Sequence, residues 1–248
     1  MTAHPEKSAA VPDEPVRPRR RGPKAWLSQE RIVEAAFRVS ERGGANALTF
    51  QAIGDELGAH PTAIYRHFRD RDELMLCLLD ALHAEALDGA PAPTRDWAED
   101  LANLARRTYA VFQRHPHVAQ FSGVRTARRE HEFRKVDQLI DCMLRAGFDE
   151  RDAARYYRVF GDFVLAYAAQ DAALAALDPD TRAADLRAWQ VDYRVLSPDE
   201  YPSITAVAHV LPALDDPANF ELALGLMIDA LKVRARKARA DRRARRAG

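Results

Sequence analysis

The sequence predicts an all-α protein with a small N-terminal three-helix unit and a larger helical domain behind it. Apolar residues recur at helical spacing from residue 28 onward, and no segment shows the apolar–polar alternation of a half-buried strand. With 248 residues and 47% hydrophobic side chains, the chain can form one or two domains with a substantial core. No apolar run approaches the roughly 18 residues that a membrane span requires, which excludes an integral membrane protein.

The first two helices of the N-terminal unit are predicted from their caps and their apolar spacing. A helix over 28–43 can begin at the cap residue Ser28, and a Gly-Gly pair ends it. A second helix over 49–57 can begin at Thr49, another residue type that caps helix starts. Residues 58–60 are predicted as a three-residue turn between this helix and the next.

The third and fourth helices follow directly. A third helix over 61–67 begins with Pro61, whose fixed φ suits the first helical position. A fourth helix over 70–87 begins at a capping box formed by Asp70 and Glu73, and leucines at helical spacing continue it. The run D-G-A-P-A-P-T then forms the clearest loop in the chain.

The chain behind this loop is predicted to be helical throughout. Gly and Pro residues divide it into segments with helical apolar periodicity. After the loop over 88–94, helices are predicted over 95–114, 116–122, 126–146, 150–176, 180–195, 203–212 and 217–240.

The formal net charge of zero conceals an uneven distribution of charge. Residues 1–24 carry six basic against three acidic side chains, and residues 231–248 carry nine basic side chains against Asp241 alone. The remaining body, 25–230, has 22 basic and 33 acidic side chains. An acidic body with basic ends indicates a polyanionic partner that touches the ends. Because residues 1–27 are rich in Pro and Arg without apolar periodicity, we expect a disordered basic arm there.

Two short helices joined by a tight, glycine-containing turn are typical of a helix-turn-helix, whose second helix enters the DNA major groove. Around this pattern the chain reads R-I-V-E-A-A-F, then G-G, then L-T-F-Q-A-I-G-D-E-L-G-A-H-P-T-A-I-Y-R-H-F-R-D-R-D-E-L. Over about residues 28–80 this run resembles the N-terminal domain of TetR-family transcriptional repressors. Further on, H-P-H-V-A-Q-F, R-A-G-F-D-E-R-D-A-A-R and N-F-E-L-A-L-G-L-M-I-D-A-L are similar to the ligand domain of the tetracycline-repressor subgroup.

The resemblance implies DNA contacts of two kinds, to phosphates and to base edges. Positions that hold backbone phosphates correspond to Thr49, Tyr65, His67 and Arg71, and those near base edges correspond to Gln51, Pro61, Thr62 and Ala63. Arg66 completes the predicted set, and the upstream arm adds Arg19, Arg20, Arg21 and Lys24 as minor-groove contacts. His60 replaces the Ser or Thr that often caps the recognition helix, and with Pro61 and Ala63 it makes the operator sequence unpredictable.

Each of these assignments has a plainer alternative. Tyr65 and Phe68 could be core residues of a three-helix bundle, and for Phe68 we favour that interpretation. The basic arm could be a solvated tail. The C-terminal basic run is expected to extend the last helix into solvent, with non-specific attraction to nucleic acid as a side effect.

Two of the predicted helices, over 150–176 and 217–231, are apolar on nearly all sides. Such a helix must be buried on both sides, either at the centre of the domain or against a second subunit. The resemblance favours the second subunit, because these helices look like the pair that builds a four-helix dimer interface. The predicted interface comprises Tyr157, Gly161, Val164, Ala168, Phe220, Leu224, Met227 and Ile228.

A ligand pocket in the larger domain is a further prediction, although aromatic stripes at helical spacing equally suit a plain core. The candidate lining residues are Leu82, Tyr109, Phe112, Phe121, Arg125, Phe133, Met143, Trp189 and Tyr193. The tetracycline repressors bind a magnesium–drug chelate through a His near 121–125, and this sequence has none there. His115 and His117 lack partnered carboxylates in the sequence, so neither a metal nor a cofactor is predicted. Cys77 and Cys142 fit a reducing cytoplasm as inert core residues.

The sequence therefore predicts a ligand-responsive transcriptional repressor in the cytoplasm. It would bind a palindromic double-stranded operator as a homodimer and release it when a small-molecule inducer binds. An all-α enzyme is disfavoured, because no nucleophile elbow, Walker loop, H-E-x-x-H or Rossmann fingerprint occurs. A constitutive or architectural DNA-binding protein without a ligand pocket remains the alternative. The predicted divisions are a basic arm (1–27), a DNA-binding domain (28–75), a ligand-binding and dimerisation domain (76–231) and a basic tail (232–248).

Overall fold

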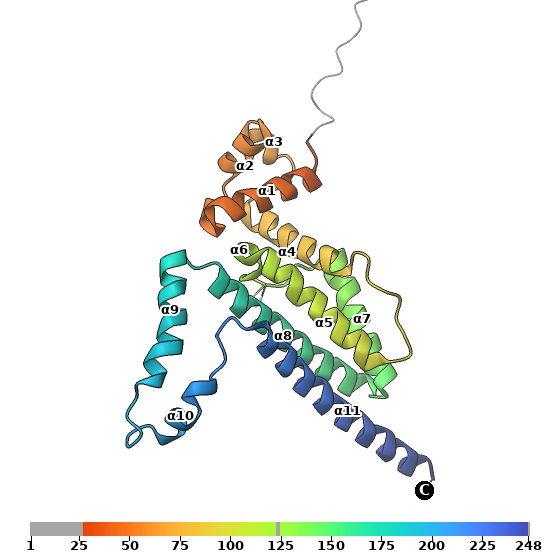
Figure 1. Cartoon of the computed structure of the whole chain (residues 1–248). Coiled ribbons are helices and arrows are strands. Elements are labelled where there is room, and N and C mark those ends of the chain that lie inside the picture. The colour runs from red at the N-terminus through yellow and green to blue at the C-terminus, as the bar shows by residue number, and fades with distance from the viewer. Residues whose placement is uncertain (1–26, 123–124, 248) are drawn as a thin grey trace, which may run out of the picture.

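The computed structural model describes residues 27–122 and 125–247, and within these ranges every regular element is a helix (Figure 1). The predicted all-α class is confirmed, with a small N-terminal unit standing on one end of a larger helical body. The predicted basic arm, with Arg19, Arg20, Arg21 and Lys24, lies outside the described residues.

The N-terminal unit comprises α1 (Gln29–Gly43), α2 (Phe50–Leu57) and α3 (Pro61–Ile64). A short 3₁₀ turn, η2 (Ala45–Ala47), joins the first two. The predicted caps are present: the backbone N–H groups of Arg31 and Ala52 donate to the side chains of Ser28 and Thr49, respectively. The α-helix of the third element ends at Ile64, so the predicted extent to residue 67 is wrong, and residues 65–67 form a turn instead. Five side chains that are almost fully buried form the centre of this unit: Ile32, Leu48, Ile53, Ile64 and Phe68.

Helix α4 (Arg71–Leu87) connects this unit to the body. Asp70 caps its first turn by accepting from the backbone N–H of Glu73 at 2.8 Å. Leu74 packs with the N-terminal core, whereas Leu78 and Leu82 continue the same buried cluster toward Phe112 in the body. One apolar cluster therefore crosses the predicted boundary between residues 75 and 76 without interruption.

The body is built from α5 (Trp97–Arg114), α6 (Pro116–Ala119), α7 (Glu130–Ala146) and α8 (Glu150–Ala175). Its second buried cluster includes Leu101, Met143 and Phe160 from three of these helices, together with Phe220 from the C-terminal helix. The predicted start of the third body helix at residue 126 is wrong, because α7 begins at Glu130.

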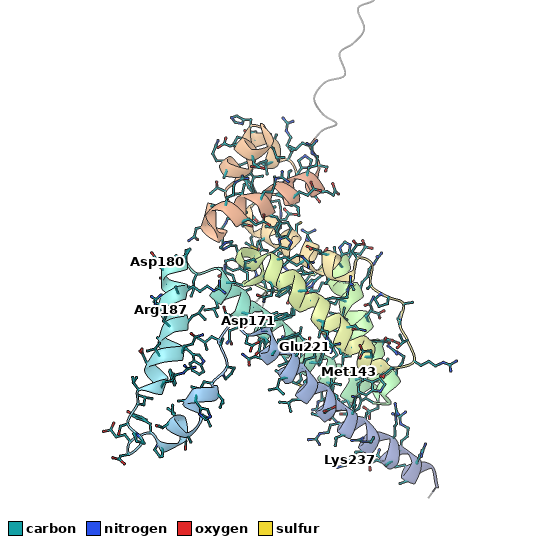
Figure 2. All side chains as sticks on the ribbon, in the orientation of Figure 1. Met143, Asp171, Asp180, Arg187, Glu221 and Lys237 are labelled. Atoms are coloured by element: carbon teal, nitrogen blue, oxygen red, sulfur yellow. The ribbon has the colours of Figure 1, made fainter. Side chains whose placement is uncertain are left out.

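Beyond α8, two elements project from the body before the chain returns to it (Figure 1). These are α9 (Pro179–Val191) with η3 (Asp192–Arg194), and α10 (Pro202–Val207) with η4 (Ala208–Val210). Two contacts tie α9 to the segment that leads back: Trp189 Nε1 donates to Pro212 O at 2.6 Å, and Arg182 pairs with Asp215 at 2.8 Å. Figure 2 labels Asp180 in the first turn of α9, just beyond α8, and Arg187 further along this helix.

The chain ends in α11 (Pro217–Ala247), which returns along the body beside α8. This helix passes through the predicted start of a separate tail at residue 232. Ala235 is buried, and Arg239 Nε donates to Ala146 O, a carbonyl at the C-terminus of α7, at 2.8 Å. Residues beyond 231 thus pack on the body, and the expectation that they only extend into solvent is wrong for this turn.

Membrane-span criteria are met by no single helix among the described residues. One bent pair, 150–175 with 179–194, reaches the length and composition of a span when the two are joined, at an angle of 113°.

Candidate DNA-binding surface and ligand cavity

Three residues predicted to hold phosphates surround one hollow on the N-terminal unit. Thr49, Tyr65 and Arg71 line a depression of about 430 Å³ between the starts of α2 and α4. The Tyr65 side chain is 59% exposed and meets the ring of Phe50 edge-on at a centroid distance of 4.7 Å. Tyr65 is therefore not a core residue, whereas the preferred core assignment of Phe68 is confirmed by its 1% exposure.

The Arg71 guanidinium also has partners within the chain. Its Nε donates to Leu48 O at 2.9 Å and its Nη2 donates to Ala45 O at 2.8 Å. A guanidinium has five N–H donors in a planar fork, so donors remain beyond these two bonds. Arg71 thus fixes the connection between α1 and α2 while lining the hollow.

The residues predicted near base edges lie at the starts of α2 and α3. Gln51 and Thr62 are exposed, and Pro61 and Ala63 are half-buried. Gln51 Nε2 donates to Asp55 Oδ1 at 2.8 Å, which fixes the amide along the helix. Arg66 is exposed and His67 half-buried in the turn that follows α3.

His60 caps the recognition helix in place of the Ser or Thr expected there. Its Nδ1 accepts from the backbone N–H of Thr62 at 3.3 Å. The turn before it depends on Gly54, because a Cβ at this position would lie 2.6 Å from Ala59 O. Gly58 ends α2 in the left-handed region with φ +63°. The angle between α2 and α3 is therefore set by backbone contact that only glycine permits.

The larger domain holds a cavity of about 350 Å³ among α4, α5, α7, α8 and the segment that leads into α7. Its wall combines apolar side chains with polar groups that come from each of these elements. The apolar lining includes Leu104, Ala105, Val136, Leu139, Phe160, Val164 and Leu165; the polar lining includes His83, Thr108, Ser122, Arg125, Thr126, Glu132, Lys135, Tyr157, Arg158 and Asp162. A cavity in which apolar walls and convergent polar groups occur together is a candidate small-molecule site.

Two basic side chains are buried at this cavity. Lys135 Nζ lies 3.0 Å from His83 Nδ1, and both side chains are buried. Burial lowers the pKa of Lys135 to about 7 and that of His83 to about 2. Neither residue was among the predicted pocket residues, because a lysine and a histidine among charged neighbours give no sequence signal of burial.

An ion pair joins the cavity to the start of α4, the helix that follows the N-terminal unit. Arg125, at the cavity, pairs with Asp72 in the first turn of α4, with Nη1 2.7 Å from Oδ1. The neighbouring Arg71 lines the DNA-side hollow. Two adjacent residues at the start of α4 therefore contact the two candidate sites: Arg71 lines the hollow, and Asp72 pairs with the cavity-lining Arg125.

His115 forms a second connection between the unit and the body. Its Nδ1 lies 3.3 Å from Glu41 of α1, and its Nε2 lies 2.9 Å from Glu85 of α4. The expectation that this histidine lacks carboxylate partners is therefore wrong. Because the two carboxylates meet opposite edges of the ring, they do not converge on one point. Among the described residues, no group of three His, Cys, Asp or Glu side chains is placed to hold a metal ion.

Models of known protein families match the two parts of the chain separately. Residues 32–78 match the model described as bacterial regulatory proteins, tetR family. Residues 90–235 match the model described as tetracyclin repressor-like, C-terminal domain, which covers more than half of the chain. The chain belongs to the TetR family. It is a transcriptional regulator with an N-terminal helix-turn-helix, as the resemblance implied.

Relatives of this TetR-family chain include characterised and structurally solved regulators. The HTH-type transcriptional repressor DrrR1 of Streptomyces coeruleorubidus is 23% identical over 219 residues, 86% of this chain and 80% of its own. A possible TetR family transcriptional regulator from Streptomyces coelicolor superposes with a TM-score of 0.70 at 26% identity, covering 83% and 99% of the two chains. The TetR family protein ActR of the same organism, in complex with actinorhodin, gives a TM-score of 0.71 at 24% identity, covering 84% and 98%. At that identity the ActR likeness shows the fold alone.

The predicted pocket residues of this TetR-family protein lie mostly outside the cavity. Of the nine predicted residues, Arg125 and Phe133 line the cavity. Tyr109 instead stacks on Phe220 at 4.0 Å and donates its hydroxyl to Asp171, which Figure 2 labels on α8. The others serve elsewhere: Leu82, Phe112 and Met143 are buried in the core, Phe121 packs against it, and Trp189 and Tyr193 lie on the projecting elements.

The structure places five of the eight predicted dimer-interface residues in the interior of their own chain. Most of them are buried inside their own chain, so they cannot face a partner in this arrangement. Val164, Ala168, Phe220, Leu224 and Ile228 are each at most 6% exposed, Met227 packs against the same core, and Tyr157, Gly161 and Val164 line the cavity. The periodicity identified buried faces correctly, but the chain itself covers them.

The two cysteines lie in apolar helical surroundings, as predicted. Cys142 is buried and Cys77 is half-buried. Burial raises the pKa of the Cys142 thiol to about 11 and raises that of Cys77 as well. Both thiols are therefore poor nucleophiles at neutral pH.

Proposed function

We propose that this TetR-family regulator is a repressor that binds a palindromic operator as a homodimer and releases it when a small molecule enters the cavity. The observation that carries the proposal is the placement of α4. Arg71 at its start lines the DNA-side hollow, and His83, twelve residues later, lines the cavity. At 1.5 Å rise per residue the two sites lie about 18 Å apart along one helix. A displacement of α4 at the cavity therefore moves the DNA-binding unit.

The outward face of α11 supports a dimer. Leu222, Leu226 and Val233 recur at helical spacing on this face and are more than half exposed, as is Val159 on α8. Exposed large apolar side chains in one stripe mark an interaction surface rather than an ordinary solvated face. A two-fold axis through α8 and α11 would bury the same stripe on both copies. The two recognition units would then contact half-sites about 34–36 Å apart, or a small multiple of that spacing.

Release would follow from the fixed spacing of the operator half-sites. A ligand that binds one orientation of α4 better than the other shifts the population toward that orientation. The distance between the two recognition units then no longer matches the operator. A coupling of about 1–3 kcal/mol would weaken operator binding roughly 5- to 150-fold. The ActR complex with actinorhodin supports the binding of a small molecule in this fold. The similarity to the repressor DrrR1 supports repression rather than activation.

The test uses the reciprocity of the two binding events. An operator is first selected from random duplexes, and a ligand is identified from a metabolite library by thermal stabilisation. The ligand is then titrated with and without saturating operator. We expect weaker ligand binding in the presence of operator, by the same factor by which the ligand weakens operator binding. Equal affinities would support the alternative of a constitutive DNA-binding protein.

The last part of the proposal assigns a function to each domain and to the N-terminal arm. We assign DNA binding to residues 28–75 with the arm 1–27 in the minor groove, and ligand binding and dimerisation to 76–231, in the cytoplasm. Removal of residues 1–24 should then weaken operator binding and make its salt dependence shallower, because the basic side chains of the arm would no longer neutralise phosphates. An unchanged affinity and salt slope would identify the arm as a solvated tail.

A further inference from the structure

Lys135 is a buried basic group that has no anionic hydrogen-bond partner among the described residues; the nearby Glu132 carboxylate acts on it only through its charge. Its side chain is 6% exposed and lines the cavity, and its Nζ lies 3.0 Å from His83 Nδ1. Within the described ranges, no carboxylate oxygen lies within 4.0 Å of Nζ. Long charged side chains are almost never fully buried unless they are paired. Lys135 is therefore as deeply buried as a lysine in an ion pair, although no carboxylate lies within ion-pair distance of it.

The other charged groups at the cavity already have partners. Arg125 pairs with Asp72 at 2.7 Å, and Arg158 Nε donates to Asp162 Oδ2 at 2.8 Å. Glu132 accepts from the backbone N–H of Arg128 at 2.6 Å. Charged or titratable groups face Lys135 from each element packed around it except α5, which contributes Thr108 as a polar group. These groups are Asp80 and His83 from α4, His131 and Glu132 from α7, Tyr157, Arg158 and Asp162 from α8, and Arg125 from the segment before α7.

The hydrogen-bonding capacity of Lys135 and His83 shows which kind of acceptor Lys135 still lacks. An ammonium group has three donors, and a neutral His83 can accept one of them through Nδ1. Charging Lys135 in this surrounding is costly unless the remaining donors find an acceptor that carries negative charge. The adjoining wall, which includes Leu139, Phe160 and Val164, can bury an apolar body. The cavity therefore combines an apolar wall with one unfilled position for an anionic oxygen.

We propose that the cavity takes an acidic amphipathic ligand, whose carboxylate or phenolate oxygen accepts a hydrogen bond from Lys135 Nζ while its apolar body fills the cavity. The inference rests on the proposed function, in which this cavity holds the inducer. The ligand enters as the anion, and the amine takes one proton from solvent where it was neutral, so an ammonium–oxyanion pair forms. No covalent bond is made or broken in the ligand.

Proton uptake follows from the burial of the amine. Burial lowers the pKa of this amine in the free protein to about 7, so near neutral pH part of the population is unprotonated. An anion at hydrogen-bond distance stabilises the ammonium form and raises that pKa. Ligand binding at pH 7 to 8 therefore draws protons from solvent, and the affinity for an anionic ligand falls as the pH rises through this range.

The experiment uses two probe molecules of nearly equal shape, 2-naphthoate and 2-naphthamide. Each is titrated calorimetrically into the full chain at pH 7.5, in two buffers of different ionisation enthalpy. We expect 2-naphthoate to bind at least about 10-fold more tightly, because its hydrogen bond is made between charged groups. We also expect net proton uptake with 2-naphthoate and none with 2-naphthamide. The uptake measurement needs no variant, so it holds even if a substitution perturbs folding.

Variants then assign the effect to Lys135. Lys135→Met keeps a long unbranched side chain and removes the charge, so it should abolish the preference for 2-naphthoate and its proton uptake but retain 2-naphthamide binding. Lys237→Met, at an exposed position labelled near the end of α11 in Figure 2, is the matched control and should change neither. Arg125→Gln tests the rim and should leave proton uptake intact.

Four results would overturn the proposal. The preference for 2-naphthoate could persist in Lys135→Met, it could be lost in Arg125→Gln alone, or the wild type could favour neither probe. In the third case the cavity still binds both, so the proposed function stands and only the acidic ligand class fails. In the fourth, neither probe binds at millimolar concentration; the acidic ligand class then fails, and the metabolite-library screen decides the proposed function separately.

Discussion

Asp80 of α4 supplies the cap that α7 lacks, and His131 is held by the same carboxylate. Its Oδ1 accepts from the backbone N–H groups of His131 and Glu132 at 3.1 and 2.9 Å, and its Oδ2 lies 2.9 Å from His131 Nδ1. The residue at the cap position of α7 itself, Arg129, makes no side-chain cap. The helix that carries the DNA-binding unit is thus bonded directly to a helix that lines the cavity.

Asp80→Ala should lower the free energy of unfolding by about 1–3 kcal/mol, because it leaves a helix N-terminus without its acceptor in a half-buried place. Asp80→Asn should cost less, since its amide oxygen can still accept. Urea unfolding followed by circular dichroism measures both. Asp137→Ala, at an exposed position of α7, is the control and should stay within about 0.5 kcal/mol of wild type. A similar effect for Asp80→Ala and Asp137→Ala would mean that the cap does not stabilise α7.

The Arg125–Asp72 pair should contribute little to stability, because both side chains are well exposed. A double-mutant cycle with Arg125→Gln and Asp72→Asn should give an interaction energy of about 0.2–1 kcal/mol at low salt, and less at 1 M salt. Chemical unfolding of the four proteins measures this energy. An interaction that is zero at both salt concentrations would show that the pair does not join the two units in solution.

On the DNA-binding surface, substitutions should separate positioning from base recognition. Tyr65→Phe removes the hydroxyl that is predicted to bind a DNA phosphate, so it should weaken binding to all duplexes by about 0.5–1.5 kcal/mol. Gln51→Ala should relax the preference at one base pair, with a change of roughly 1–3 kcal/mol there. Selection from random duplexes and fluorescence anisotropy measure the two effects, with Tyr193→Phe as the control on the projecting elements. If Gln51→Ala selects the same DNA motif as wild type, Gln51 does not contact a base edge.

Leu226→Glu should shift the protein from dimer to monomer at micromolar concentration. Leu226 is 66% exposed in the centre of the outward stripe of α11, and a buried unpaired charge on both copies would be costly. Sedimentation velocity measures the distribution. Leu144→Glu, on an exposed position of α7, is the control and should leave it unchanged. A dimer that survives Leu226→Glu would place the two-fold interface elsewhere.

The pH dependence of stability should report the buried amine. Folding lowers the pKa of Lys135 from its ordinary value near 10.5 to about 7, so between these values the unfolded chain binds more protons. The contribution of this group to the free energy of unfolding therefore rises with pH, by up to about 1.4 kcal/mol per pH unit. Below pH 7 the destabilisation caused by burying the charged lysine is fully present. The difference between wild type and Lys135→Met, measured by urea unfolding from pH 7 to 9, isolates this effect. Parallel pH profiles for the two proteins would contradict a neutral buried lysine.

Helix order and most helix limits could be predicted because local signals determine them. Ser28, Thr49 and Asp70 cap helices through bonds to backbone groups three residues away, which a sequence shows directly. The start of α7 was misplaced because its acceptor is Asp80, about fifty residues earlier in the chain. No local pattern could reveal that bond.

The sites were predicted unequally for a related reason. Thr49, Tyr65 and Arg71 belong to a short motif with fixed spacing, and they do surround one hollow. The cavity depends on how four helices and a loop pack, so Lys135 and His83 were missed. Apolar periodicity shows that a helix face is buried, but it does not identify which element covers that face. For this reason, most residues of the predicted dimer face are covered by other helices of the same chain.

The close approach of Gly54 to Ala59 O has a genetic consequence. A search for chains that no longer repress should recover substitutions at Gly54 as readily as at the residues that touch DNA, because any side chain there forces α2 and α3 apart. Such alleles would keep the cavity and the outward face of α11, which lie in the other part of the molecule. In a cell that also makes the wild-type chain, they would form mixed dimers with one incompetent half and would be dominant. Alleles that damage the apolar core shared along α4 would instead be recessive, since the altered chain would not accumulate.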